Sequence, residues 1–213
     1  MIEVAVIDYG VGNLLSVSRA LEHCGARVTV TSDAATILAS GRVVLPGVGA
    51  FADGMVALRA HGLDGVVRQL AATGTPLLGI CLGMQMLLDG SEEFGVTTGL
   101  GLIPGRVVRI PATTTTGAPH KIPHIGWNEL VLPAQRESWQ GGLLDGIEPG
   151  EAAYFVHSFM AEPASLAHRL ADCQYGGIPI SAAVQRDNVL GCQFHPEKSG
   201  DVGLRVLRNF LRR

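Results

Sequence analysis

The chain has 213 residues, 47% of them hydrophobic and only 16% charged, with 28 glycines and a formal net charge of −3 at pH 7. Because no block of like charge occurs, we expect neither a nucleic-acid-binding nor a membrane-surface protein, and no apolar run is long enough to cross a bilayer. A chain of this length predicts one domain, residues 1–213, that buries about 70% of its unfolded surface. Low charge with many glycines is typical of an α/β fold with buried parallel strands and tight turns.

Short apolar runs alternate with helical patterns in the N-terminal third of the chain. We expect strands over residues 2–7, 27–31 and 42–45, and helices over 14–24, 33–39, 51–59 and 63–73. Asn13 is expected to cap the first of these helices. The alternation predicts a doubly wound, mostly parallel central sheet flanked by helices. In such a sheet, ligands bind beyond the carboxyl ends of the strands.

The cysteines and the first loop bear on cofactors and location. Cys24, Cys81, Cys173 and Cys192 show neither a metal-ligand spacing nor a disulfide-dense pattern, so we expect cytosolic thiols and no metal. The glycine pair at positions 10 and 12 lacks the third glycine, the P-loop lysine and the acidic residue of a nucleotide site, so we expect no cofactor. The chain begins directly with a strand and shows no export signal, which predicts a cytoplasmic protein.

A corner between strand and helix carries the first chemical signal. Residues 76–80 predict a buried strand and residues 82–88 a helix, with Cys81 between them. Gly79 and Gly83 flank it as Gly-x-Cys-x-Gly, the thiol version of the nucleophile elbow, in which backbones pass too close for a Cβ atom. The positive end of a helix dipole favours a thiolate there. A lone cysteine is more often a small buried hydrophobe, so a second element is needed.

The region after this corner predicts a second group of strands. Residues 100–110 begin an added antiparallel region, and the threonine-rich residues 111–120 predict a mobile surface loop. Residues 154–159 are expected to form a strand that enters a loop. Further strands are expected over 169–174, 178–186 and 189–194. Asp201 is expected to cap a final helix with Leu204, Leu207 and Leu211 on one face, and its arginine-rich end is interpreted as a basic last turn.

The second chemical signal is His195-Pro-Glu197, at the end of the last expected strand. Residues two apart in an extended backbone project to one side, so the Glu197 carboxylate is expected to orient the His195 imidazole and stabilise its protonated form. His157 is a rival general base, but no carboxylate adjoins it in the sequence. Together with the corner, this run predicts a thiol amidase or acyl-transfer site with Cys81 as nucleophile, His195 as base and Glu197 as orienting group.

Both signals resemble the catalytic motifs of the class I, triad-type glutamine amidotransferases, and the resemblance extends from Val4 to the C-terminus. Four further stretches are similar to motifs of the glutaminase subunits of imidazole glycerol phosphate synthases, which act in histidine biosynthesis. These stretches are Asp8-Tyr-Gly-Val-Gly-Asn-Leu14, Leu45-Pro-Gly-Val-Gly-Ala-Phe51, Lys121-Ile-Pro-His-Ile-Gly-Trp-Asn128 and Phe155-Val-His-Ser-Phe159. The resemblance implies one glutaminase domain over residues 1–213.

The resemblance also implies roles for residues outside the triad. The corner offers the backbone N–H of Leu82 to a developing oxyanion, and the resemblance places the second donor at Val48, after the glycine-rich turn rearranges. It implies contacts to the glutamine substrate from Gly49, Gln85, Ser158 and Phe159. It implies a surface for a partner subunit that includes Asn13, Lys121, His124, Trp127 and Asn128.

The function implied is hydrolysis of glutamine to glutamate through a Cys81 thioester, with ammonia passed to a (β/α)₈-barrel synthase subunit in a heterodimer. Every expected element belongs to the amidase module, so a separate acceptor of ammonia is needed. Two alternatives stay open. One is the glutaminase component of anthranilate or aminodeoxychorismate synthesis, against which the stretches 8–14 and 121–128 argue. The other is a non-catalytic regulatory module, against which the intact Cys81, His195 and Glu197 argue.

Overall fold

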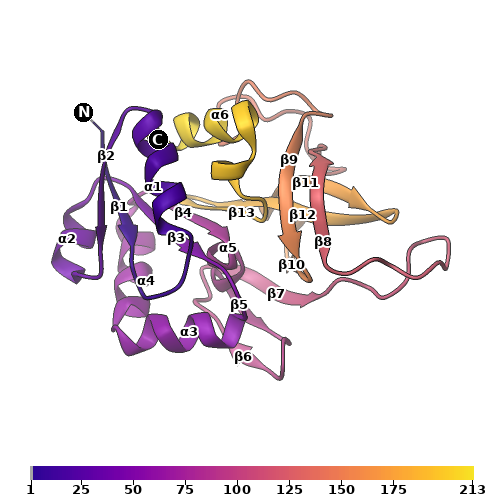
Figure 1. The fold of residues 1–213 in the computed structure, drawn as a ribbon, viewed down its shortest axis with the longest axis horizontal. Coiled ribbons are helices and arrows are strands. Elements are labelled where there is room, and N and C mark those ends of the chain that lie inside the picture. Colours follow the sequence, from indigo (N-terminus) through magenta and orange to yellow (C-terminus); the bar gives the residue numbers. More distant parts are fainter. Residues whose placement is uncertain (1) are drawn as a thin grey trace.

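The structure is a computed structural model that describes residues 2–213. Its central sheet has seven strands in the order β11-β12-β13-β4-β3-β1-β2 (Figure 1). The parallel part consists of β1 (Ile2–Ile7), β2 (Ala26–Thr31), β3 (Val43–Gly47), β4 (Leu77–Cys81) and β13 (Val189–Cys192). At one edge, β12 (Ile178–Arg186) and β11 (Arg169–Tyr175) continue it antiparallel. The predicted doubly wound α/β fold is therefore confirmed.

Helices cover both faces of this sheet, as Figure 1 shows. On one face lie α1 (Leu14–His23) and α6 (Gly200–Leu211), and on the other lie α2 (Ala34–Ala39), α3 (Phe51–Ala60) and α4 (Leu63–Thr73). Alternate residues of β1 enter different cores: Val4 and Val6 pack with α1, whereas Ala5 and Ile7 pack with the other helices. This period of two is why the strand is apolar at every position from Val4 to Ile7.

Two smaller sheets follow the central one along the chain. One has the order β10-β7-β5-β6, and the other is the antiparallel pair β8-β9. Their strands are β5 (Leu88–Ser91), β6 (Thr97–Thr98), β7 (Ile103–Arg109), β8 (His124–Glu129), β9 (Ala152–His157) and β10 (Phe159–Pro163). Residues 154–159 were expected to enter a loop, but only Ser158 separates β9 from β10. The chain therefore turns sharply there and changes sheets.

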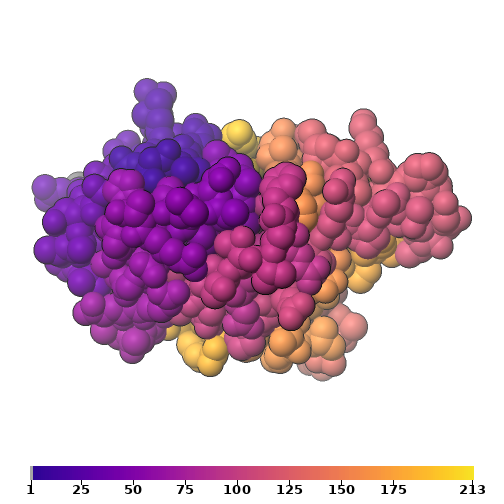
Figure 2. Space-filling view, turned by 90° about the horizontal axis from the view of Figure 1, so that it is seen from below, coloured from indigo at the N-terminus to yellow at the C-terminus, as the bar shows by residue number. Residues whose placement is uncertain are grey.

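The threonine-rich loop, residues 111–120, projects beyond the sheets at the end of the molecule (Figures 1 and 2). It is largely exposed, as predicted. It is nevertheless held by a β-bridge between Thr113 and Pro119 and by a hydrogen bond of 3.0 Å from the Thr115 N–H to the Gly176 carbonyl. No helix among residues 2–213 combines the length and the apolar character that a membrane crossing requires.

Three expectations about helix ends are wrong. The helix after Cys81, α5 (Leu82–Met86), stops before Leu88, which begins β5. Asn13 occupies the N-cap of α1, but its side chain makes no capping hydrogen bond. Asp201 lies in the first turn of α6, and the N-cap is Ser199. Local composition indicates these ends only to within a few residues because tertiary contacts decide where a helix stops.

Candidate active site

Cys81 ends β4 and is the N-cap of α5, with φ 54° and ψ −110°. A non-glycine residue with positive φ is strained, and the surrounding structure must hold it. Strain of this kind is what a nucleophile elbow requires, because the sharp turn lifts the nucleophile above the sheet. The cysteine is only 8% exposed, and the exposed part faces the cavity described below.

The flanking glycines provide the clearance that the sequence predicted. A Cβ atom on Gly83 would lie 1.8 Å from the Leu45 carbonyl oxygen on β3. One on Gly79 would lie 2.7 Å from the backbone of Gly83. Both neighbours are backbone atoms, which cannot give way as a flexible side chain can. The close packing of β3, β4 and α5 is thus possible only with glycine on both sides of the nucleophile.

His195 and Glu197 form a buried pair beyond the end of β13. His195 Nδ1 lies 2.8 Å from Glu197 Oε1, and the two side chains are 3% and 1% exposed. The contact between the two side chains is as predicted, but the backbone conformation that produces it differs from the one predicted. Residues Pro196–Lys198 form a 3₁₀ turn, not an extended segment. The turn brings the carboxylate back toward the ring, and Pro196 suits the first position of such a turn because it needs no donor there.

The backbone of His195 is anchored by two hydrogen bonds to neighbouring segments. Its N–H donates to the Tyr154 carbonyl at 3.0 Å, and its carbonyl accepts from Ser199 Oγ at 2.7 Å. Ser199 Oγ in turn accepts the Tyr154 N–H at 2.9 Å. These bonds tie the backbone of His195 to β9 and to the start of α6, so the segment that carries the imidazole is fixed.

The charge of the His195 imidazole follows from its surroundings. Burial lowers its pKa, but hydrogen bonding and charge from Cys81 and Glu197 outweigh burial and raise the pKa to about 9. His195 is therefore protonated at neutral pH and can give a proton to a leaving group. Cys81 and His195 line the same cavity, although 114 residues separate them in the sequence (195 minus 81).

A cavity of about 240 Å³ opens beside this pair. Its lining brings together most of the residues that the sequence predicted: Val48, Gly49, Cys81, Leu82, Gln85, Ser158, Phe159 and His195. Leu82 is the first residue of α5, so its N–H has no acceptor within the helix. Gly49 has φ 95°, which glycine adopts without strain. The arrangement can hold a small amide beside a thiol, with the Leu82 N–H as a backbone donor at the cavity.

Two further residues that lie at the site were missed by the sequence analysis. Gln193 is fully buried, and its Nε2 lies 3.8 Å from Cys81 Sγ while its Oε1 accepts from Gln85 Nε2 at 2.9 Å. Glu93 lines the cavity and accepts the Phe51 N–H at 2.8 Å. Gln193 stands between the apolar residues Cys192 and Phe194, close to the predicted base, and a polar residue in such a run could have indicated a buried polar group at the site. Glu93 lies in a loop and had no such signal.

His157 also lines the cavity, but it is not equipped as the base. Burial lowers its pKa to about 4, so it is neutral at pH 7. Its Nδ1 lies 2.8 Å from the Phe159 carbonyl oxygen and its Nε2 lies 3.0 Å from His124 Nδ1, so neither nitrogen meets a carboxylate. The preference for His195 over this rival agrees with the geometry.

The residues implied to face a partner are divided by the structure. Trp127 is 60% exposed and Lys121 is also exposed, while Asn13 and Asn128 are partly buried. His124 is only 2% exposed and its ring points inward to His157, so its side chain cannot contact a partner in this conformation. In an antiparallel pair, successive side chains alternate between faces, and His124 and Trp127 fall on opposite faces of β8.

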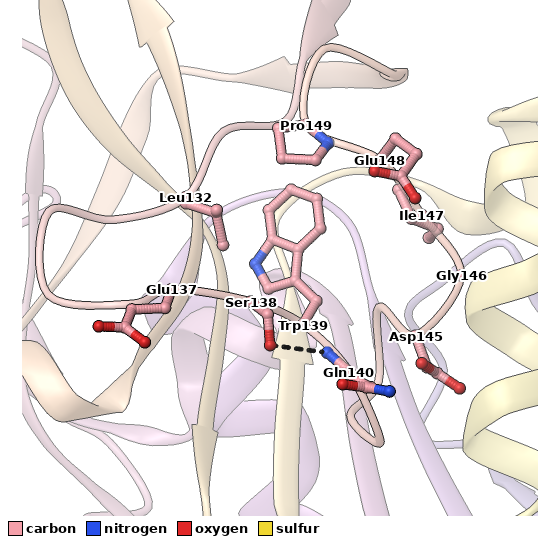
Figure 3. A pocket seen from close by; sticks show the side chains of 10 residues that line it. All are labelled: Leu132, Glu137, Ser138, Trp139, Gln140, Asp145, Gly146, Ile147, Glu148 and Pro149. Atoms are coloured by element: carbon pink, nitrogen blue, oxygen red, sulfur yellow. Dashed lines mark hydrogen bonds between the residues drawn. The ribbon is translucent and has the colours of Figure 1, made fainter.

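A larger cavity of about 480 Å³ lies elsewhere and is lined by Leu132 and by residues 137–140 and 145–149 (Figure 3). Trp139 in its lining is only 4% exposed, and its indole N–H donates to the Leu170 carbonyl at 2.7 Å. Burial and this bond indicate a structural role for the side chain. None of the predicted site residues lines this cavity. Among residues 2–213, no group of three or more His, Cys, Asp or Glu side chains is arranged to hold a metal ion.

Comparisons with known proteins agree with this geometry. The family model "Glutamine amidotransferase class-I" matches residues 5–213. The chain is 52% identical to imidazole glycerol phosphate synthase subunit HisH 1 of Legionella pneumophila (strain Lens), over 99% of each chain. It is 49% identical to subunit HisH of Geobacillus thermodenitrificans (strain NG80-2), over 99% of this chain and 96% of that one.

Solved structures show the same fold at low sequence identity. A structure of PurLQS from Thermotoga maritima aligns with a TM-score of 0.74 at 20% identity, over 99% of this chain and 98% of that chain. A glutamine amidotransferase crystal structure aligns with a TM-score of 0.73 at 20% identity, over 98% and 97%. At such identities the likeness concerns the architecture alone.

Proposed function

Because the chain belongs to the class-I glutamine amidotransferases, we propose that it hydrolyses glutamine as the glutaminase subunit of an imidazole glycerol phosphate synthase. The observation that carries this proposal is the meeting of Cys81 and a Glu197-paired His195 at one small cavity. The relatives that share about half of its residues over nearly their whole length are named as that subunit. Glutaminases for anthranilate or aminodeoxychorismate synthesis are less well supported, since the relatives described above do not carry those names.

The reaction divides into two steps at one sulfur atom. The Cys81 sulfur attacks the side-chain carbonyl carbon of glutamine, and the C–N bond breaks as His195 gives its proton to the leaving nitrogen, releasing ammonia. Water then attacks the thioester, with His195 accepting a proton from that water. The C–S bond breaks and glutamate leaves. Glu197 stays ionised and stabilises the imidazolium in both steps.

The oxyanion of each tetrahedral intermediate needs two donors. We assign one to the Leu82 N–H at the start of α5 and the second to the Val48 N–H in the turn after β3. Leu82 already lies beside the sulfur in the elbow. The peptide between Gly47 and Val48 carries the Val48 N–H, and glycine on both sides of Val48, with Gly49 at φ 95°, gives the backbone the freedom to rotate it toward the cavity. The aligned donors then stabilise charge that exists only during reaction.

The rest of the cavity is suited to the amino-acid end of glutamine. Gly49, Gln85 and the backbone of Ser158 and Phe159 form its walls, and backbone N–H groups there would hold the α-carboxylate. We assign the α-ammonium group to Glu93, the only acidic residue among those that line the cavity in the described chain. A carboxylate opposite an ammonium group forms a charge-assisted hydrogen bond.

Glu93→Gln is expected to raise the KM for glutamine by roughly 10- to 100-fold, because a hydrogen bond to a charged group is worth about 1.5–3 kcal/mol. The amide oxygen of the side chain introduced at position 93 can still accept the Phe51 N–H, so the substitution preserves the conformation of the loop. Steady-state kinetics of glutamate release measure the effect. Glu92→Gln is the matched control: Glu92 pairs with Arg106 on the surface and should leave KM unchanged. Equal effects of both variants would contradict the assignment of Glu93.

The chain works in a complex with a synthase subunit, as the names of its relatives indicate. We propose that this partner is a (β/α)₈ barrel, that the assembly is a heterodimer, and that ammonia passes to the barrel without release. The exposed face of β8, with Ile125 59% and Trp127 60% exposed, supports a docking surface close to the cavity. The loop that holds Asn13 follows β1, at the sheet edge where β4 ends at Cys81.

Glutamate release is expected to be low for the chain alone and to rise by about 5- to 150-fold with the synthase subunit and its nucleotide substrate, the range of typical allosteric coupling. The reason is that the Val48 donor becomes available only after the turn rearranges. The measurement is an enzymatic glutamate assay with and without the partner. Equal turnover in both conditions would overturn the proposed dependence on the partner.

A further inference from the structure

Two buried histidines outside the triad form a pair across the β8-β9 sheet. His124 and His157 are direct partners in the antiparallel register, and His124 Nδ1 lies 3.0 Å from His157 Nε2. They are 2% and 6% exposed. The reaction described above uses neither side chain, and the position of His124 removes it from the partner surface. Two adjacent buried imidazoles are costly unless all their polar atoms are satisfied.

The hydrogen-bond partners determine which nitrogen of each ring carries the hydrogen. A carbonyl oxygen only accepts, so His157 Nδ1, at 2.8 Å from the Phe159 carbonyl, carries a hydrogen. Burial lowers the pKa of both histidines to about 4, so each ring holds one hydrogen at neutral pH. His157 Nε2 is therefore an acceptor, and His124 Nδ1 must be its donor.

The same reasoning continues outward to the edge of β8. His124 Nε2 is left as an acceptor, and Asn128 Nδ2 donates to it at 3.2 Å. The second hydrogen of that amide goes to the Gln174 carbonyl at 2.9 Å. Asn128 Oδ1 accepts the Glu129 N–H at 2.8 Å. The position of each hydrogen is therefore fixed by its partners. In this chain of hydrogen bonds, every bond is donated in the same direction, from Asn128 through His124 and His157 to the Phe159 carbonyl.

The Phe159 carbonyl joins this chain to the cavity. It also accepts from Gln85 Nε2 at 3.1 Å, and the other hydrogen of Gln85 goes to Gln193 Oε1 at 2.9 Å. Gln193 Nε2 lies 3.8 Å from Cys81 Sγ. Both amide hydrogens of Gln85 are thereby used inside the protein, which leaves its carbonyl oxygen as the group that can receive a donor from a ligand in the cavity.

We propose that His124 and His157 are positioning residues which, as neutral rings with hydrogen on Nδ1, hold the Phe159 carbonyl and tie the placement of Gln85 in the glutamine cavity to Asn128 on β8. The inference rests on the proposed function, since it concerns the binding of glutamine. It has a consequence for the partner surface on the opposite face of β8. A partner that moves Asn128 changes the cavity, and by reciprocity glutamine changes the affinity for that partner.

The first test is spectroscopic and does not depend on activity. In the full chain with ¹⁵N-labelled histidine, the imidazole nitrogens of His124 and His157 at pH 7 are expected to show Nδ1 protonated and Nε2 unprotonated. Asn128→Asp removes the donor to His124 and is expected to change the His124 spectrum. An Nε2-protonated or cationic ring at either position in the unaltered chain would overturn the proposal.

The second test separates positioning from catalysis by kinetics in the complex. His157→Phe keeps a ring but has no donor for Phe159, and the KM for glutamine is expected to rise about tenfold while kcat changes less than about threefold. His157→Asn restores a donor near the position of Nδ1 and is expected to recover most of the KM. Equal KM values for the two variants, or a loss confined to kcat, would contradict the proposal.

The matched control is His120→Asn. His120 stacks on Tyr175 with ring centroids 4.4 Å apart, as His124 does at 4.0 Å, but it lies outside the chain of hydrogen bonds. Its KM is expected to equal that of the unaltered chain, and a rise equal to that of His157→Phe would count against the proposal. If His157→Phe fails to fold, the ¹⁵N measurement decides. Absence of glutamine hydrolysis by the unaltered complex would instead refute the proposed function and leave the tautomer result standing.

Discussion

Cys81→Ala is expected to reduce glutamine hydrolysis by at least about 10⁴-fold, because a triad enzyme that loses its nucleophile keeps only the rate supplied by binding and the oxyanion donors. No other thiol can replace it. Cys192 and Cys173 are fully buried, and Cys24 lies near Leu204 on α6. The measurement is glutamate release in the presence of the synthase subunit, where the rate of the unaltered protein is expected to be highest.

Cys24→Ala is the control for this experiment, because it removes a thiol that does not line the cavity. Its activity should match that of the unaltered chain. A glutamine-mimicking electrophile should label the unaltered protein at Cys81 and leave Cys81→Ala unlabelled. Retention of full activity by Cys81→Ala would end the proposal of a thioester. Labelling at a different cysteine would point to another nucleophile.

Glu197→Gln is expected to lower kcat by about 10³- to 10⁴-fold, the size of effect seen when the acid of a triad becomes an amide. The amide preserves the shape of the side chain buried beside His195 but removes its charge. Without that charge, the protonated imidazole is no longer stabilised. The neutral ring also loses the carboxylate that fixes its tautomer. A kcat unchanged by the substitution would show that the carboxylate does not support the base.

The pH profile gives an independent reading of the same change. His195 has its pKa raised to about 9, so activity that depends on its proton should fall as pH rises through about 9. Loss of the Glu197 charge removes one cause of the raised pKa, so the His195 pKa decreases in Glu197→Gln. The basic limb of the profile should therefore move to lower pH. If the basic limb of the pH profile of Glu197→Gln stays at the same pH, the raised pKa of His195 would be due to Cys81 alone.

The sequence predicted the elbow at Cys81 and the His195–Glu197 contact because each lies in a short motif with a local reason. Gly79 and Gly83 are required by backbone atoms within 3 Å of where a Cβ would stand, and such steric demands appear directly as glycine in the sequence. His195 and Glu197 were paired correctly, yet for a reason that was wrong. A 3₁₀ turn, not an extended strand, brings the carboxylate to the ring.

The surroundings of the triad were harder to predict because their contacts are between distant segments. Gln193, just after β13, accepts a hydrogen bond from Gln85, 108 positions earlier in the chain. Asn188, just before β13, donates to the Thr75 carbonyl ahead of β4. Nothing in the local sequence of His124 distinguishes a surface histidine from one buried against His157. Burial of that ring depends on β8 and β9 pairing, which no local pattern specifies.

The sequence by itself determined the alternation of strands and helices, the elbow at Cys81 and the choice of Cys81, His195 and Glu197 as the proposed triad. These features arise from apolar periodicity, glycine clearance and residue chemistry, all of which act over a few positions. Only the tertiary structure decided which side chains reach the cavity, the charge of His195 and the direction of the hydrogen bonds from Asn128 to Phe159. Burial and charge depend on segments that are far apart in the chain and meet only after folding.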